Sequence, residues 1–349
     1  MGNKKLARQL LFIGYYDITR LDAAPKVRIS EMSKAFRSMG TESFIIGNAR
    51  KRAFMKLKWM LTNNSNIKYA YIEGSTSTAY PMDLLFLLYL KIKKIRIAYF
   101  MRDAHPLYKN FSSLLKWYQK PLYWGWHFSV KIYQHLVDDF FSPTLFFNDI
   151  FSFGYKQFQV LPPAISGLRA NLFDTHSKHL LYVGGLSSFY GIEKIEALLC
   201  FMEENEPQFR LHIITREAEL GRIKKHKNCT IESLNYDDLP TLSSKYFAGL
   251  LTISGEYADL ALSVKMFDYF SLGLPIIMTE SYSHRKFIEE TGAGFVADSD
   301  EPIETFIQNI LKQPEVLNSA VESINRVIPQ DHTWTKRART VLDTLGVKD

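Results

Sequence analysis

Along the first 165 residues, short apolar runs alternate with stretches that are apolar at every third or fourth position. Leu10–Gly14 is an apolar run that ends in glycine, and Ser43–Ile46 is a second one. Between them, apolar residues recur at helical spacing and Gly40 follows the last, which predicts a helix with a glycine stop. The helical positions are Ile29, Met32, Phe36 and Met39. Strand, helix and strand in this order predict a βαβ unit and a parallel sheet.

The same alternation continues through the chain. Further strands are predicted at residues 69–72, 95–100, 140–142 and 158–161, and helices at 81–94 and 112–137. After a polar stretch at 166–177 the pattern starts again. This half has predicted strands at 179–183, 209–215, 230–233, 248–253, 276–278 and 295–296, and helices at 192–203, 302–312, 316–327 and 334–345.

We therefore predict an α/β protein with two Rossmann-like domains that face each other across a cleft. Residues 1–165 would form the N-terminal domain and residues 178–330 the C-terminal domain. Residues 331–349 would form a terminal helix that packs back on the N-terminal domain. Open parallel sheets bind ligands at the carboxyl ends of their strands, so we expect the site where the two sheets present these ends.

Charge is divided unevenly between the two halves of the 349-residue chain. Residues 1–165 contain 24 Lys and Arg against 10 Asp and Glu, whereas residues 166–349 contain 19 against 26. The helix at 112–137 also carries three tryptophans and several lysines, a composition typical of a core helix or of a helix in a lipid interface. We expect the basic half to contact an anionic membrane surface. No recognised motif predicts a nucleic-acid partner.

The remaining composition favours a cytoplasmic protein, peripheral on the cytosolic face of a membrane. Cys200 and Cys229 provide neither a disulfide framework nor a metal-ligand spacing, which suits a reducing compartment. The apolar run at 10–13 is too short for a signal peptide. The most apolar segment, at 84–90, is followed by KIKKIR and is too short to span a bilayer.

The stretch at 261–279, ALSVKMFDYFSLGLPIIMT, predicts an amphipathic helix, a glycine stop and a buried strand. Lys265 and Asp268 lie one turn apart near the helix start and share a face. A cation and a carboxylate at a helix N-terminus suit a ligand with a phosphate at one end and hydroxyls at the other. The alternative is an ion pair on the helix surface.

Several segments together resemble one enzyme family. They are LLYVGGL, LHIIT, LNYDDLP, SVKMFDYFSLGLPIIMT and GAGFVADSDE in the second half, and MRDAHP and LPPAI in the first. In this order they resemble the GT-B glycosyltransferases of the family-4-like group. The resemblance implies a nucleotide-sugar donor, with a UDP-sugar favoured, and a glycan or polyprenyl-linked acceptor. It also implies roles for individual residues: Asp268 would hold ribose hydroxyls and Lys265 the diphosphate, with the backbone of Gly184 and Gly185 beside the phosphates.

This sequence departs from the family pattern at the sugar end of the site. The first acid of the E-x7-E pair falls on Leu260, with Glu256 and Asp259 nearby as substitutes. Gly185 and Tyr190 stand near the places of a basic pair that usually follows the first strand of this half. Arg102 replaces the usual histidine before Asp103, which would suit a carboxylated donor sugar. The resemblance therefore leaves retaining and inverting chemistry both open.

Residues of the first half are candidates for catalysis and acceptor binding. An inverting reaction requires a general base, for which Asp103 is the first candidate and His105 the second. The alternative for Asp103 is a salt bridge with Arg102. The loop after the first strand would touch the acceptor through Gly14, Asp17 and Arg20.

We expect no metal ion and no cofactor besides the nucleotide sugar. The D-x-D sequence Asp298-Ser299-Asp300 follows the last predicted strand, where a metal site is not expected. Two alternatives to a transferase remain: a non-catalytic GT-B partner subunit of another glycosyltransferase, and a nucleotide-sugar epimerase.

Overall fold

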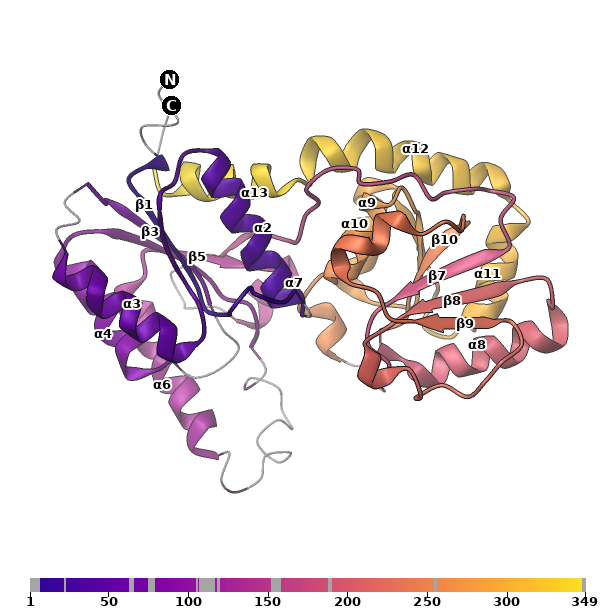
Figure 1. Ribbon diagram of the computed structural model, residues 1–349, viewed down its shortest axis with the longest axis horizontal. Coiled ribbons are helices and arrows are strands. Elements are labelled where there is room, and N and C mark those ends of the chain that lie inside the picture. Colours follow the sequence, from indigo (N-terminus) through magenta and orange to yellow (C-terminus); the bar gives the residue numbers. More distant parts are fainter. Residues whose placement is uncertain are drawn as a thin grey trace. The chain divides into compact units, whose positions relative to one another are not determined.

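The chain folds into two compact units, shown in the computed structural model of Figure 1. The structure describes residues 7–21, 23–62, 66–74, 79–104, 106, 117, 120–151, 158–187, 190–253 and 256–346. Unit 1 comprises Met1–Pro162 together with Trp334–Asp349, and unit 2 comprises Pro163–Thr333. The polar stretch at 166–177 therefore belongs to unit 2, and the last helix belongs to unit 1.

Unit 1 is built on a parallel six-stranded sheet with the order β2-β1-β3-β4-β5-β6. Its strands are β1 (Leu10–Gly14), β2 (Ser43–Ile46), β3 (Tyr69–Glu73), β4 (Arg96–Phe100), β5 (Asp139–Ser142) and β6 (Phe158–Val160). Parallel strands covered by helices on both faces read as continuous apolar runs, and all five residues of β1 are buried accordingly.

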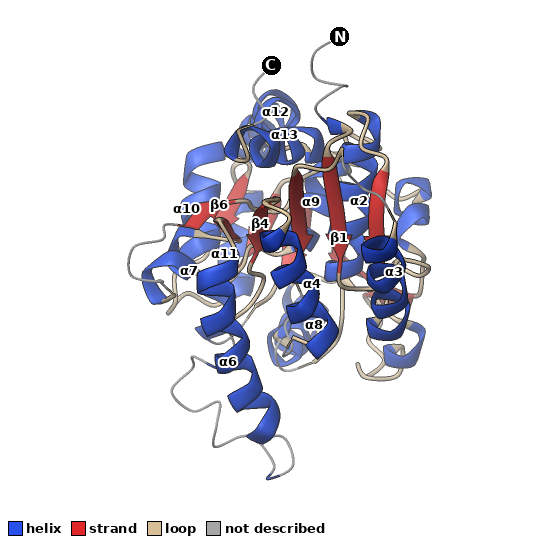
Figure 2. Cartoon of the chain, turned by 90° about the vertical axis from the view of Figure 1, so that its left-hand side faces the viewer, coloured by secondary structure: helices blue, strands red, loops and turns tan. Residues whose placement is uncertain are grey.

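Helices cover both faces of this sheet. They are α2 (Ala24–Ser38), α3 (Ala49–Leu61), α4 (Pro81–Ile92), α6 (Lys120–Leu136), α7 (Leu145–Ile150) and α13 (Trp334–Thr344). Helix α13 packs against α2, while α4 contacts both α3 and α6. The chain moves one way from β1 to β2 and the other way from β2 through β5. Right-handed crossovers therefore place α2 on one face and α3, α4 and α6 together on the other, as Figures 1 and 2 show.

Unit 2 repeats the architecture with the strand order β12-β11-β10-β7-β8-β9. Its strands are β7 (His179–Val183), β8 (Arg210–Ile214), β9 (Cys229–Glu232), β10 (Ala248–Leu251), β11 (Ile276–Met278) and β12 (Gly294–Val296). Its helices are α8 (Ile192–Asn205), α9 (Val264–Ser271), α10 (Tyr282–Thr291), α11 (Ile303–Leu311) and α12 (Pro314–Asp331), with 3-10 turns η4 (Glu217–Glu219), η5 (Tyr236–Thr241) and η6 (Glu256–Asp259). Two parallel sheets flanked by helices confirm the predicted α/β class. The predicted helix at 112–137 is described only from residue 120 on, apart from Trp117.

Helix α9 is fixed to the unit 2 sheet by the side chain of Tyr269. Its hydroxyl donates to the carbonyl of Leu250 in β10 at 2.8 Å and accepts from the N–H of Val183 in β7 at 2.8 Å. The ring lies against Gly249, where an added Cβ would overlap it. These contacts fix the position of α9 relative to the carboxyl end of β7.

We predict that Gly249→Ala lowers the free energy of unfolding by about 1–3 kcal/mol, because a methyl group must displace the Tyr269 ring in a packed core. Gly221→Ala is the control, since no atom lies within 4 Å of the position of its added Cβ. Urea unfolding of both variants measures the difference. An equal effect of the two substitutions would contradict the packing described here.

Candidate functional site

The first candidate site lies where α9 meets the loop after β7. The Nζ atom of Lys265 lies so close to the backbone of Gly184 that a Cβ added there would overlap it. Gly184 has a φ of +151°, a backbone conformation that residues other than glycine rarely adopt. Glycine is therefore required at this position both by its conformation and by the lysine beside it.

The Lys265 ammonium group is enclosed and has no hydrogen-bond partner among the residues the structure describes. It lies 3.8 Å from the ring centroid of Tyr190 and 5.2 Å from that of Tyr182, within the range of cation–π attraction. Burial lowers the pKa of Lys265 to about 7, and Arg216 adds to this effect, while Asp268 and Glu219 offset part of it. The alternative interpretation, an ion pair with Asp268 on the helix surface, therefore does not describe this enclosed group.

The loop after β7 is held by its own network. Glu219 is buried and accepts from the N–H of Leu186 at 3.2 Å and from the hydroxyl of Thr215 at 3.1 Å. The hydroxyl of Tyr182 donates to the carbonyl of Gly185 at 2.7 Å. The N–H of Gly184 donates to Ile214 at 2.9 Å. The sequence suggested that the N–H groups of both glycines approach a phosphate, but the N–H of Gly184 is already bonded to Ile214.

Asp268 follows Lys265 by one turn of α9 and is buried, with 8% of its surface exposed. Because the two residues lie one turn apart, its negative charge offsets part of the lowering of the Lys265 pKa. A carboxylate can accept two hydrogen bonds from a vicinal diol, and an ammonium group can bind phosphate oxygens. The pair can therefore bind the sugar and the phosphate of one nucleotide.

The sequence analysis did not identify Arg216 as a site residue and gave no role to Tyr190. Arg216 is exposed just beyond the carboxyl end of β8 and lies near enough to Lys265 to lower its pKa. Strand β8 neighbours β7, so a basic residue at its end is the signal that could have indicated a second cation. Tyr190 stands near the place of an expected basic residue, and its ring instead packs on Lys265.

The segment before α9 does not offer a simple replacement for the missing acid. Leu260 is buried, with 2% of its surface exposed. The Oδ1 atom of Asp259 accepts from Ser281 Oγ at 3.0 Å and from the N–H of Tyr282 at 2.6 Å, so it caps α10. The side chain of Glu256 lies outside the described residues.

His284 is a further residue that the sequence analysis did not single out. It is fully buried; its Nε2 accepts from the N–H of Ser263 at 2.9 Å, and its Nδ1 lies 2.8 Å from Ser281 Oγ. Burial lowers its pKa to about 3, so the ring is neutral at ordinary pH. His284 thereby ties the start of α9 to α10.

In unit 1, Arg102 and Asp103 follow β4. The guanidinium of Arg102 lies 3.5 Å from Glu73, and its Nε and Nη2 atoms have no hydrogen-bond partner among the described residues. Glu73 also accepts from Arg28 Nε at 3.0 Å and from the hydroxyl of Tyr71 at 2.7 Å. Asp103 is buried. His105 lies outside the described residues.

The three predicted acceptor residues lie at the end of β1 and in the loop that follows it. Gly14 is the last residue of β1 and is buried, with an added Cβ meeting Ile29. Asp17 accepts from the N–H of Thr19 at 2.9 Å, and this bond lowers the pKa of its carboxyl group. Arg20 is exposed. Their role in acceptor binding stays a prediction.

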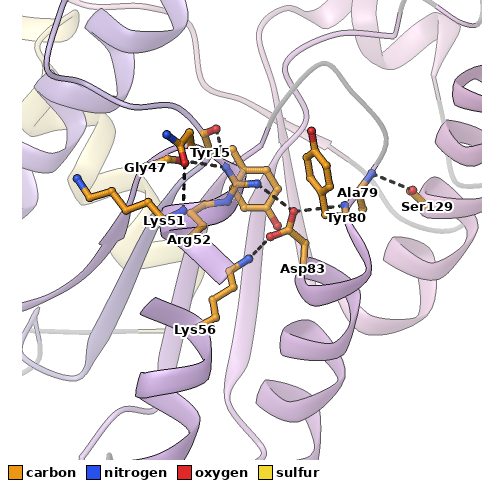
Figure 3. Close-up of polar contacts among 10 residues, drawn as sticks. Tyr15, Gly47, Lys51, Arg52, Lys56, Ala79, Tyr80, Asp83 and Ser129 are labelled. Carbon is orange, nitrogen blue, oxygen red and sulfur yellow. Dashed lines mark hydrogen bonds and ion pairs between the residues drawn. The ribbon is translucent and has the colours of Figure 1, made fainter. Parts of the chain in front are cut away.

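A second polar cluster in unit 1 was not predicted (Figure 3). Arg52 and Lys56 of α3 both donate to the carboxylate of Asp83 in α4, Arg52 at 3.0 Å. Arg52 also donates to the carbonyls of Tyr15 at 2.8 Å and Gly47 at 2.9 Å, and its Cζ lies 4.1 Å from the Tyr15 ring centroid. The cluster therefore joins the ends of β1 and β2 to the first turn of α4.

All three charged groups of this cluster are buried, with at most 2% of each residue exposed. Burial lowers the pKa of Lys56 to about 8, and Asp83 offsets only part of this effect. Burial raises the pKa of Asp83, but Lys56 and Arg52 together hold it below its usual value. One carboxylate therefore balances two cations, of which only the lysine loses its proton at moderately alkaline pH.

Two absences concern only the described ranges, residues 7–346 with their gaps. No three His, Cys, Asp or Glu side chains there gather closely enough to hold a metal ion. No helix there is long and apolar enough to cross a membrane. Asp298 of the D-x-D sequence pairs with Arg285 at 2.9 Å.

One known family matches the chain over part of unit 2 and the first residues of α13. Residues 200–338 match the model of the glucosyltransferase 3-like C-terminal domain, a range that includes Lys265 and Asp268. A search of curated proteins gave no match.

Solved structures resemble the chain over nearly its whole length. Sucrose-phosphate synthase from Thermosynechococcus elongatus is 10% identical, with 96% of this chain and 97% of that chain covered and a TM-score of 0.65. Anabaena HepE in complex with UDP-glucose is 10% identical, with 97% and 99% covered and a TM-score of 0.67. WaaG, a glycosyltransferase involved in lipopolysaccharide biosynthesis, is 15% identical, with 96% and 99% covered and a TM-score of 0.64. At these identities the likeness shows the fold, the two Rossmann-like domains of the GT-B type.

We predict that Lys56 makes the protein more stable as the pH rises from 7.5 to 9.5. Its pKa is about 8 in the folded chain and about 10.4 in an unfolded chain, so the unfolded state binds more protons in this interval. The free energy of unfolding should therefore increase by about 1–2 kcal/mol more in the wild type than in Lys56→Met. Urea unfolding at the two pH values measures this, with Lys58→Met, an exposed position of the same helix, as the control. Equal pH dependence in wild type and Lys56→Met would contradict the prediction.

Proposed function

We propose that this chain transfers a sugar from a nucleotide diphosphate sugar, preferably a UDP-sugar, to a hydroxyl group of a glycan or lipid-linked glycan, without a metal ion. The proposal rests chiefly on one observation. An enclosed lysine ammonium group, which has no hydrogen-bond partner in the described part of the chain, lies over a glycine at the carboxyl end of a parallel strand. The carboxyl ends of the strands are where open α/β sheets bind ligands.

Charge supports a diphosphate as the ligand of Lys265. A buried cation without a partner costs free energy, and a phosphate oxygen would supply the missing acceptor. Arg216 adds a second cation for the same diphosphate, in place of the basic pair that the family pattern led us to expect. Together they can stabilise the departing nucleotide diphosphate without a metal ion.

We place the ribose of the same nucleotide beside Asp268. Its carboxylate lies one turn further along the same helix, and it would accept hydrogen bonds from the ribose hydroxyls of a nucleotide whose diphosphate meets Lys265. Three similar structures are of Anabaena HepE in complex with UDP, with UDP and glucose, and with UDP-glucose, and this favours uridine as the base.

The acceptor side of the proposal belongs to unit 1. Asp103 would act as the general base of an inverting reaction, or would position the acceptor in a retaining one, and His105 is the second candidate. Arg102 would contact the donor sugar, and the loop with Gly14, Asp17 and Arg20 the acceptor. A lipid-linked acceptor would place the enzyme peripherally on the cytosolic face of a membrane.

We predict that UDP binds the wild-type protein and that Lys265→Met weakens this binding by about 10- to 100-fold, since a charged hydrogen bond contributes about 1.5–3 kcal/mol. Asp268→Asn should weaken UDP binding as well, through the ribose. Isothermal titration calorimetry measures both, with Lys312→Met and Asp300→Asn as control variants at positions away from the site. Wild-type protein that binds none of UDP, GDP, ADP or CMP would contradict the proposal.

Turnover distinguishes transfer from the two alternatives. A transferase consumes UDP-sugar only in step with glycosylation of an acceptor, apart from slow hydrolysis. An epimerase converts the donor with no acceptor present. A chain that binds UDP but consumes no donor with a panel of sugars and acceptors would indicate a non-catalytic partner subunit.

A further inference from the structure

The helices α3, α4 and α6 turn an unusually apolar surface away from the unit 1 sheet. Each carries large apolar side chains that are 46–80% exposed. They are Phe54, Leu57 and Leu61 in α3, Leu85, Leu88 and Ile92 in α4, and Trp124 and Phe128 in α6. These three helices are neighbours on one side of the sheet (Figures 1 and 2), and we call this surface the α3–α4–α6 face.

The exposed apolar residues follow helical spacing. In α4 they recur at Leu85, Leu88 and Ile92, while Phe86, Leu87 and Leu90 on the other side fill the core. In α3 the exposed apolar residues recur at three and four positions in the same way. A helix that is apolar all round normally has both sides covered. Exposed apolar patches of this kind mark an interaction site rather than ordinary surface.

The polar residues of this face are almost all basic. Exposed cations on the three helices and the residues directly after α4 are Arg50, Lys51, Lys58, Lys93, Lys94, Lys120 and Lys131. The one acidic residue within the three helices is Asp83, which is buried and pairs with Arg52 and Lys56. The face therefore combines apolar side chains with positive charge that no exposed carboxylate of the same helices offsets.

The combination of apolar side chains and positive charge favours one binding partner of this face over others. A second copy bound through a twofold axis would place the same patch on itself and bring these cations together. An anionic lipid surface attracts them instead, at about 1 kcal/mol for each lysine or arginine, and accepts the apolar side chains below its headgroups. An exposed tryptophan such as Trp124 also suits the level of the headgroups.

We propose that the α3–α4–α6 face binds an anionic phospholipid membrane, with its apolar side chains in the headgroup region and its lysines on lipid phosphates. This assigns the surface that would carry the peripheral membrane location. Its link to a lipid-linked acceptor rests on the proposed function, whereas lipid binding by the face does not.

Vesicle flotation of the full chain tests the proposal. Vesicles of phosphatidylcholine with about 30% phosphatidylglycerol should bind the wild type at least tenfold more strongly than vesicles of phosphatidylcholine alone. Leu88→Glu combined with Phe128→Glu should lower this binding at least tenfold, and Lys93→Gln combined with Lys94→Gln about tenfold. Leu168→Glu combined with Leu220→Glu in unit 2 is the matched control, because both leucines are exposed there and should not matter.

A far-ultraviolet circular dichroism spectrum and a urea unfolding midpoint close to those of the wild type show that each variant is folded. Equal binding to both kinds of vesicle would overturn the proposal, as would equal losses from the unit 1 and unit 2 pairs. Light scattering that shows a dimer dissociated by Leu88→Glu would assign the face to a second copy instead. If vesicle binding behaves as expected while no nucleotide binds, the proposed function fails and this inference stands.

Discussion

The main physical constraint on unit 2 is the Lys265 ammonium group, which is enclosed at the carboxyl end of β7. Burying a cation without a partner opposes folding, and the lowered pKa of Lys265 expresses that cost. Three contacts hold it there nevertheless. Tyr269 fixes α9 to two strands, His284 ties the start of the helix to α10, and the ring of Tyr190 lies against the ammonium group. The rest of the unit 2 core thus stabilises a site that would be more stable with an anion bound.

In unit 1, by contrast with Lys265, the buried cations have carboxylate partners. Arg52 and Lys56 share Asp83, and Arg28 and Arg102 share Glu73. In both clusters two cations converge on one carboxylate near the carboxyl ends of strands, so a positive charge remains inside the unit. Part of the excess charge of the first half is therefore structural, and a further part is exposed on the α3–α4–α6 face.

The sequence was sufficient to predict the alternation of strands and helices and the placement of Lys265 and Asp268 one turn apart on one helix. These features follow from periodicity and from spacing within one element. It could not predict that the N–H of Gly184 is already bonded to Ile214 or that Asp259 caps α10, because these bonds join segments that are distant along the chain. Arg216 and His284 escaped notice for the same reason. The sequence predicted helix α4 but not its exposed apolar side, because only the folded unit shows which side of the helix is uncovered.

Proton uptake on UDP binding tests the central claim most directly. With a pKa of about 7, Lys265 is mostly neutral at pH 8 in the free protein, and a diphosphate beside it favours the charged form. Calorimetry in buffers of different ionisation enthalpy should then show uptake of about one proton at pH 8 and little at pH 6. Lys265→Arg, which stays charged, should show little uptake at either pH. UDP binding without proton uptake at pH 8, or the same uptake in the arginine variant, would contradict the assignment of Lys265 to the diphosphate.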